Sequence, residues 1–228
     1  MDNLFSDQRY YIRMTEALIE SNYDFGNTII QGDYTPYQKG STITAYHGTT
    51  SSGIEIFDPS KSSIDSLHGK GIFFTTDPIE ALGYALGRPS GERHSGDGFV
   101  YECKITFDKI MDVGIYTEFD PNIFKEVFGL ELQEGERISR NDIWDMANSA
   151  QKQGIGVNGD NVHTMFSNAG YTAAIKYACP TDFSARTYHD RIKMMNKKGI
   201  KIVKSMTSKE ARANFKEELA KQKEYLGY

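Results

Sequence analysis

The feature that most constrains the fold is the stretch of residues 44–85, which holds two short apolar runs. The first run ends in the letters HGTT, the second reads IFFTT, and each is followed by a turn and a helical pattern. Short apolar runs bounded by Gly, Pro and Asp are typical of buried strands. Strand ends and helix starts therefore carry three side chains capable of chemistry, His47, Thr75 and Tyr84.

Length and composition favour one ordinary globular domain. The chain has 228 residues, of which 39% are hydrophobic and 25% charged, which is typical of a folded protein with a real core and not of a disordered one. We expect a single domain over residues 1–228. Its periphery is expected to carry an N-terminal helical attachment over 1–40, a helical insertion over 120–170 and a closing helix over 207–228.

Charge and cysteine usage narrow the classes of partner. The net charge of −5 argues against a nucleic acid held mainly by phosphate contacts, although a local basic face would be hidden in that sum. Cys103 and Cys179 are the two cysteines and the five histidines are scattered singly, so neither a disulfide framework nor a metal site is predicted. The N-terminus has no signal-peptide pattern and no apolar stretch reaches membrane length. We therefore expect a cytoplasmic protein without a membrane partner.

Strand and helix patterns are mixed along the chain, an order typical of α+β proteins. Strands are expected over 42–46, 72–75, 99–107, 170–177, 190–196 and 200–204, helices over 7–22, 78–87, 121–128, 140–153 and 161–168, and loops over 22–40, 54–66 and 178–189. Asp77 followed by Pro78 predicts a helix start. Thr207 and Glu210 have the spacing of a capping box that opens the closing helix.

Three segments also resemble the motifs of a known family. They are YHGT at 46–49, GKGIFFT at 69–75 and EALGYA at 80–85. In order and spacing they resemble the first two signatures of the ADP-ribosyltransferase superfamily, in its histidine–tyrosine–acidic branch, which includes diphtheria-toxin-like and poly(ADP-ribose)-polymerase-like enzymes and compact bacterial and phage relatives. The match covers residues 42–86 and continues more weakly through 170–171 and 190–204, while the helical block and the first forty residues match nothing.

The resemblance implies a fold and a reaction. The fold is α+β, a split pair of small, mainly antiparallel sheets with peripheral helices and an NAD cleft between the sheets. NAD is the implied co-substrate, without a metal, and the implied reaction moves ADP-ribose to a macromolecular acceptor with release of nicotinamide. A protein acceptor is favoured and a nucleic acid is possible. A catalytically inactive module that binds NAD or a partner, and an NAD glycohydrolase, are the alternatives.

Substitution at the anomeric carbon of NAD passes through a species resembling an oxocarbenium ion, so its site needs a carboxylate, an aromatic clamp and positioned donors. The resemblance implies that His47 holds a ribose hydroxyl, that the backbone of Gly48 pairs with the nicotinamide carboxamide, and that Tyr84 stacks on the nicotinamide ring. By themselves, His47 and Gly48 could equally be turn residues and Tyr84 a core aromatic. Tyr84 is, however, two residues from Leu82 and so does not share its helix face.

The same resemblance extends NAD binding to Thr49, Gly71, Phe73 and Thr75. Gly71 belongs to a lone Gly-x-Gly that either admits backbone amides to the dinucleotide or makes a tight turn into a strand. Phe73 and Phe74 are also interpreted as core residues, one on each face of the strand. Thr75 stands at the strand end, where it can line the site.

The third motif departs from the common pattern. The best register puts Asp190 where better known members carry a glutamate, so the implied catalytic set is His47, Tyr84 and Asp190. Asp190 would orient a ribose hydroxyl, stabilise the cationic transition state and deprotonate the acceptor. The alternative is an exposed aspartate at a strand edge, with Asp182 and Glu102 as rival carboxylates.

Acceptor recognition is assigned to the segment before Asp190. Tyr188 stands two residues earlier, where parts of the family carry a glutamate or glutamine, so the acceptor stays open. Tyr188, Arg186 and Phe183 are predicted to present an aromatic and basic surface to a protein side chain or a base. The nearby lysines form either a basic strip or a solvated strand face; they are Lys193, Lys197, Lys198, Lys201 and Lys204.

Overall fold

The structure is a computed structural model that describes most of the chain from residue 37 onward. The described residues are 37–62, 70–87, 98–113, 116–118, 121–122, 125, 131, 133–139, 142–147, 159–168, 170–181 and 184–226. The helix expected over 7–22 lies outside the described residues, as do Gly69, Asp182 and Phe183.

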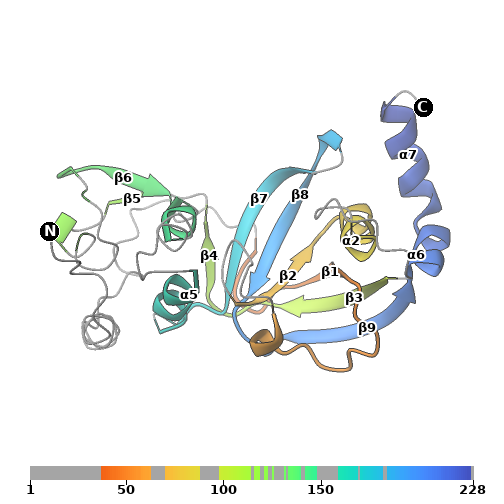
Figure 1. The fold of residues 1–228 in the computed structure, drawn as a ribbon, viewed down its shortest axis with the longest axis horizontal. Helices are drawn as coiled ribbons and strands as arrows, with labels where there is room; N and C mark the ends of the chain where they lie inside the picture. Colours follow the sequence, from red (N-terminus) through yellow and green to blue (C-terminus); the bar gives the residue numbers. More distant parts are fainter. Residues whose placement is uncertain are drawn as a thin grey trace, which may run out of the picture.

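Seven strands form one sheet in the order β4-β7-β8-β2-β1-β3-β9 (Figure 1). They are β1 (Thr42–Thr49), β2 (Ile72–Thr75), β3 (Phe99–Thr106), β4 (Ile110–Asp112), β7 (Ala173–Thr181), β8 (Ser184–Met194) and β9 (Ile200–Thr207). Neighbouring strands are antiparallel except β4 and β7, which are parallel. A separate ladder pairs β5 (Tyr116–Glu118) with β6 (Arg137–Ser139). The described chain is thus an α+β fold around a mixed, mostly antiparallel sheet.

The expected split into two core sheets is not what the structure has, because β1 and β2 join the two halves into one sheet. The join is narrow: β1 and β2 are in register through Tyr46 and Thr75, whereas β1 pairs with β3 along its whole length. On its other side β2, which has four residues, pairs with β8 along its whole length. We call this junction of Tyr46 with Thr75 the seam. It divides a β4-β7-β8-β2 half from a β1-β3-β9 half.

An apolar core spans both halves on one face of the sheet. The β1-β3-β9 half contributes Ala45, Tyr101, Cys103 and Ile105, and the other half contributes Ile72, Phe74, Ala173, Ile175, Ile192 and Met194. Phe57, from the segment expected to be an exposed loop, is buried in this core against Phe74 and Tyr101. Burial of this shared apolar surface holds the halves together across the seam.

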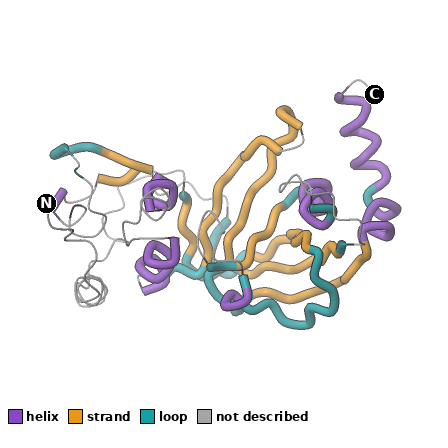
Figure 2. Tube along the Cα trace, in the orientation of Figure 1, coloured by secondary structure: helices purple, strands orange, loops and turns teal. Residues whose placement is uncertain are grey.

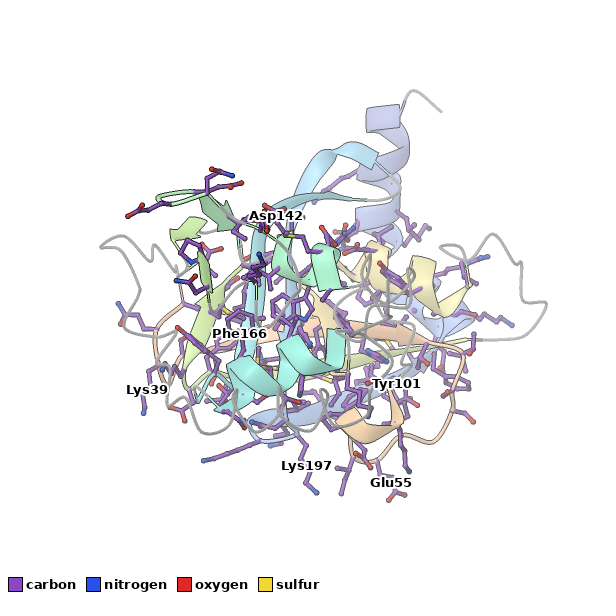
Figure 3. The ribbon with its side chains drawn as sticks, turned by 60° about the vertical axis from the view of Figure 1, so that its left-hand side comes forward. Lys39, Glu55, Tyr101, Asp142, Phe166 and Lys197 are labelled. Carbon is purple, nitrogen blue, oxygen red and sulfur yellow. The ribbon has the colours of Figure 1, made fainter. Side chains whose placement is uncertain are left out.

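Helices cover the opposite face of the β1-β3-β9 half. They are α2 (Pro78–Ala85), α6 (Ser208–Asn214) and α7 (Lys216–Leu226), which lie on one side of the sheet in Figures 1 and 2. Their apolar residues Ile79, Leu82 and Phe215 pack with Val100 and Met206. At the far end, α5 (Gly159–Asn168) lies near β4. Figure 3 shows Phe166 of α5 inside, while Lys39, Glu55 and Lys197 project outward.

Local capping signals act as expected. The Asp77 side chain accepts a hydrogen bond from the backbone N–H of Ile79 at 2.8 Å, with Pro78 at the first helical position. Thr207 and Glu210 form a reciprocal capping box at the start of α6. The closing helix is two helices, however, because the chain bends at Phe215 between α6 and α7.

Two other predictions from the sequence were wrong. The loop over 178–189 is instead the hairpin of β7 and β8, whose register shifts near Cys179 and Pro180 blur the alternation that marks a strand. The region 120–170, expected to be a helical insertion, contains the strand β6 besides its described helical segments. A short 3₁₀ helix, η1 (Pro59–Lys61), follows Phe57 in the segment expected to be a loop. Within the described residues, no helix has both the length and the hydropathy needed to cross a membrane.

Candidate functional site

A cavity of about 420 Å³ opens beside the seam. Its walls come from β1, β2, α2 and the β7–β8 hairpin, and Val113 and Trp144 also line it. The expected site residues among its lining are His47, Gly48, Phe73, Thr75 and Tyr84. Tertiary folding therefore brings the first two sequence motifs around one space, which is in the size range of small-molecule sites.

His47 is held in one orientation. Its Nδ1 lies 2.7 Å from the carbonyl oxygen of Phe73, which can only accept, so Nδ1 donates and Nε2 is the acceptor of the neutral ring. The ring packs edge-on against Phe57 and beside Phe74, at centroid distances of 4.9 Å and 5.7 Å. Burial lowers the pKa of His47, and the bond to Phe73 opposes this only in part. A neutral imidazole whose Nε2 accepts from a hydroxyl is therefore the form that this position favours.

Gly48 is required by packing whether or not a ligand binds. A Cβ at this position would lie 1.7 Å from the carbonyl oxygen of Ala81 and 2.9 Å from the backbone nitrogen of Ala85. The close contact joins the end of β1 to α2, the helix that carries Tyr84. β1 runs to Thr49, so His47 and Gly48 lie within a strand and not in the turn that the sequence alone permits.

Gly71 and Thr49, also expected at the site, are not among the residues that line the cavity. The Gly71 N–H donates to Oγ of Ser62 at 2.9 Å, and a Cβ on Gly71 would come 2.5 Å from Cε of Lys193. Thr49 accepts a hydrogen bond from the N–H of Ser51 at 3.1 Å. In this structure Gly71 therefore makes room for a lysine and Thr49 stabilises a turn.

The pleat of β2 sends consecutive residues to opposite faces. Phe74 is buried in the core, whereas Phe73 is half-buried at the cavity wall, as expected for one phenylalanine on each face. Thr75 is buried, and its Oγ1 accepts from the N–H of Asp77 at 3.1 Å. Tyr84 is 39% exposed on the same wall, which excludes its interpretation as a core aromatic.

Asp190 is not among the lining residues. Its backbone pairs with Thr76, and its Oδ2 accepts a hydrogen bond of 2.6 Å from the hydroxyl of Tyr37. The ring of Tyr37 packs on Phe107 at 5.2 Å, against the core that spans both halves. Since successive strand residues face opposite sides of a sheet, Arg191 faces the cavity and the Asp190 carboxylate is held on the core side with Tyr37.

The cavity also has charged walls, to which the sequence analysis assigned no role. Glu80, 1% exposed, receives Nε and Nη2 of Arg191 on Oε1 at 2.9 Å and 2.6 Å. Lys193 is buried with Nζ 4.8 Å from the centre of the Trp144 ring, and Lys176 lines the same space. Two sequence features are consistent with this placement but do not predict it: Glu80 precedes Tyr84 by one helical turn, and Arg191 and Lys193 alternate along one strand.

The predicted acceptor residues cannot be placed by their side chains. Arg186 and Tyr188 belong to β8, where Tyr188 pairs with Pro180, and Phe183 lies outside the described residues. The hairpin that carries them extends beyond the rest of the sheet in Figure 1. Of the rival carboxylates, Asp182 is outside the described residues, and Glu102 on β3 does not line the cavity.

No cluster of three or more metal-binding side chains occurs in the described part of the chain. No protein-family model matches this sequence, and a comparison with curated proteins finds no relative.

Proposed function

We propose that the chain is an NAD-dependent ADP-ribosyltransferase that transfers ADP-ribose to a macromolecular acceptor and releases nicotinamide. The observation that carries the proposal is the convergence of His47, Gly48, Phe73 and Tyr84 on one cavity. Phe73 and Tyr84 supply aromatic walls suited to a flat, electron-poor ring. His47 offers a neutral acceptor nitrogen to a ribose hydroxyl.

The proposed reaction is a substitution at C1′ of the nicotinamide ribose. The bond to the pyridinium nitrogen breaks, and its electron pair leaves with nicotinamide. A lone pair of the acceptor forms the new bond to C1′, and the acceptor gives up its proton. We propose that NAD binds in the cavity beside the seam. This is the position in which a cleft between two separate sheets would lie.

The proposed acceptor is a protein, which binds at the projecting hairpin whose strand β8 carries Arg186 and Tyr188. The resemblance puts the catalytic carboxylate at Asp190. Asp190 lies next in the chain to Arg191, which does line the cavity.

A second function, an inactive module that binds NAD or a partner, is favoured by one observation. The Asp190 carboxylate is bonded to Tyr37 and is not at the cavity. NAD binding measured by calorimetry, without release of nicotinamide, would support this function over the transferase.

The test of the main proposal follows nicotinamide release and label transfer from tagged NAD in a lysate. Tyr84→Ala is expected to weaken NAD binding about tenfold through loss of stacking. Val203→Ala, which truncates an exposed side chain that does not line the cavity, is the control. A wild-type chain that neither binds NAD nor releases nicotinamide would refute the proposal.

Treatment of the labelled product identifies the acceptor. Label that protease removes and nuclease leaves intact supports a protein acceptor, and the reverse supports a nucleic acid. Release of nicotinamide without any label on macromolecules identifies an NAD glycohydrolase.

A further inference from the structure

We infer that Glu80 on α2 is the carboxylate that faces the positively charged end of the bound donor, where a pyridinium or an oxocarbenium ion lies next to ribose. Glu80 is the one acidic side chain among the described residues that line the cavity. The inference rests on the proposed function for the identity of this ligand, but its binding test does not require turnover.

Glu80 stands at the correct place relative to the aromatic wall. It precedes Tyr84 by one helical turn, and residues four apart lie on one face of a helix. Both line the cavity. The contact of Gly48 with the carbonyl oxygen of Ala81 fixes this part of α2 against β1, so Glu80, Tyr84 and His47 belong to one packed unit.

Glu80 is buried but has an ion-pair partner. The side chain is 1% exposed, and an isolated carboxylate at such a site would favour its neutral form. The guanidinium of Arg191 opposes this, because its Nε and Nη2 lie 2.9 Å and 2.6 Å from Oε1. Charges interact more strongly where water is excluded, so Glu80 stabilises a cation that lies nearer to it than to Arg191.

Arg191 acts as a positioning residue in this arrangement. It occupies the cavity-facing position of β8 next to Asp190, and its Nε hydrogen bond and Nη2 ion-pair contact to a single oxygen of Glu80 set the direction of the carboxylate. The Asp190 carboxylate is instead held by Tyr37. Among the described lining residues, the acidic group therefore comes from α2 and the basic groups, Lys176, Arg191 and Lys193, come from β7 and β8.

Glu80 forms no covalent bond in this proposal. The C1′–nitrogen bond breaks, its electron pair leaves with nicotinamide, and the fixed charge of Glu80 stabilises the positive charge that develops on the ribose. The acceptor's lone pair then completes the substitution, and its proton passes to solvent.

The test compares two ligands that share one ring. Nicotinamide riboside carries a positive charge on its pyridinium, and nicotinamide is neutral. Glu80→Gln keeps the size of the side chain and an oxygen for Arg191 but removes the charge. We expect calorimetry to show about 10- to 100-fold weaker binding of the riboside, while nicotinamide binds within about threefold of wild type.

Three further variants decide the outcome. Glu55→Gln removes an exposed carboxylate away from the cavity and is expected to change neither affinity. The double variant Glu80→Gln/Arg191→Gln leaves no unpaired guanidinium, so it serves if the single variant fails to fold. It is expected to show a smaller loss that is still selective for the riboside, because one charge of each sign is removed. Unchanged riboside affinity in Glu80→Gln, or a selective loss in Asp190→Asn instead, would overturn the inference.

Failure of the inference differs from failure of the proposed function. If Glu80→Gln binds the riboside selectively less well but wild type releases no nicotinamide from NAD, the transferase proposal fails and the inference stands. If wild type consumes NAD and only Asp190→Asn is impaired, the inference fails and the function stands. If wild type binds neither ligand, both fail.

Discussion

Two buried ionisable side chains set the chemistry of the cavity at the scale of single residues. Burial lowers the pKa of His47, which favours its neutral form, and Arg191 is paired with the buried Glu80. An imidazole and an ion pair thus line the same cavity. Neither environment follows from residue type alone, because each depends on what the fold places around the group.

The lowered pKa of His47 predicts how stability depends on pH. The unfolded chain takes up a proton near the ordinary value of 6.5, but the folded chain does so only at lower pH. The contribution of neutral His47 to stability is therefore full above that value and is lost as pH falls through it toward the folded pKa. Urea unfolding between pH 8 and pH 5 should show a smaller stability loss in His47→Gln than in wild type. Parallel curves would contradict this.

At the scale of elements, α2 organises the site. Asp77 and Pro78 fix where the helix begins, its apolar face packs on Val100 and Met206, and its other face carries Glu80 and Tyr84 to the cavity. The missing side chain at Gly48 lets β1 touch the helix backbone. One short helix thereby links the core to the site.

Loss of the hydrogen bond that caps α2 should weaken ligand binding. Asp77→Ala removes the hydrogen bond to the Ile79 N–H and is expected to cost about 1 kcal/mol of unfolding free energy and to weaken nicotinamide binding. Thr207→Ala removes the equivalent bond at α6, so it should cost about the same stability without changing the affinity. Thermal unfolding measures the stability of both variants, and calorimetry measures their affinity for nicotinamide. Equal affinities in the two variants would show that the α2 cap does not affect the site.

At the scale of the whole molecule, the two halves of the sheet depend on a shared core more than on backbone pairing. The seam joins them through Tyr46 and Thr75, whereas apolar residues of both halves pack together on one face. A cavity can therefore open beside the seam without dividing the protein into separate domains.

This arrangement predicts one cooperative unfolding transition. Trp144 is the single tryptophan and packs beside Lys193 of β8, so its fluorescence reports on one half, while far-ultraviolet dichroism reports on all strands. The two signals should coincide. Phe74→Ala should lower the unfolding free energy by about 3–5 kcal/mol, and the exposed Val203→Ala by no more than about 0.5 kcal/mol. Separate transitions would show that the halves unfold independently.

Elements with strong local signals were predicted well. The strand over 72–75 and the caps at Asp77 and Thr207 agree with the structure, because proline, cap and apolar spacing act within a few residues. The β7–β8 hairpin was missed since a register shift near Cys179 interrupts its period. The joined sheet was also missed, because pairing of Tyr46 with Thr75 depends on two strands distant in sequence.

The sequence by itself determined the strand, turn and helix unit that carries Phe73 and Tyr84, because local periodicity and capping specify such a unit. Only the tertiary structure decided which carboxylate reaches the cavity. Strand register turned Asp190 toward Tyr37, 153 residues away in the chain, and helix packing brought Glu80 to Arg191, 111 residues away. Contacts between such distant residues leave no pattern in a local stretch of sequence, so the negative charge at the site could be found only after folding.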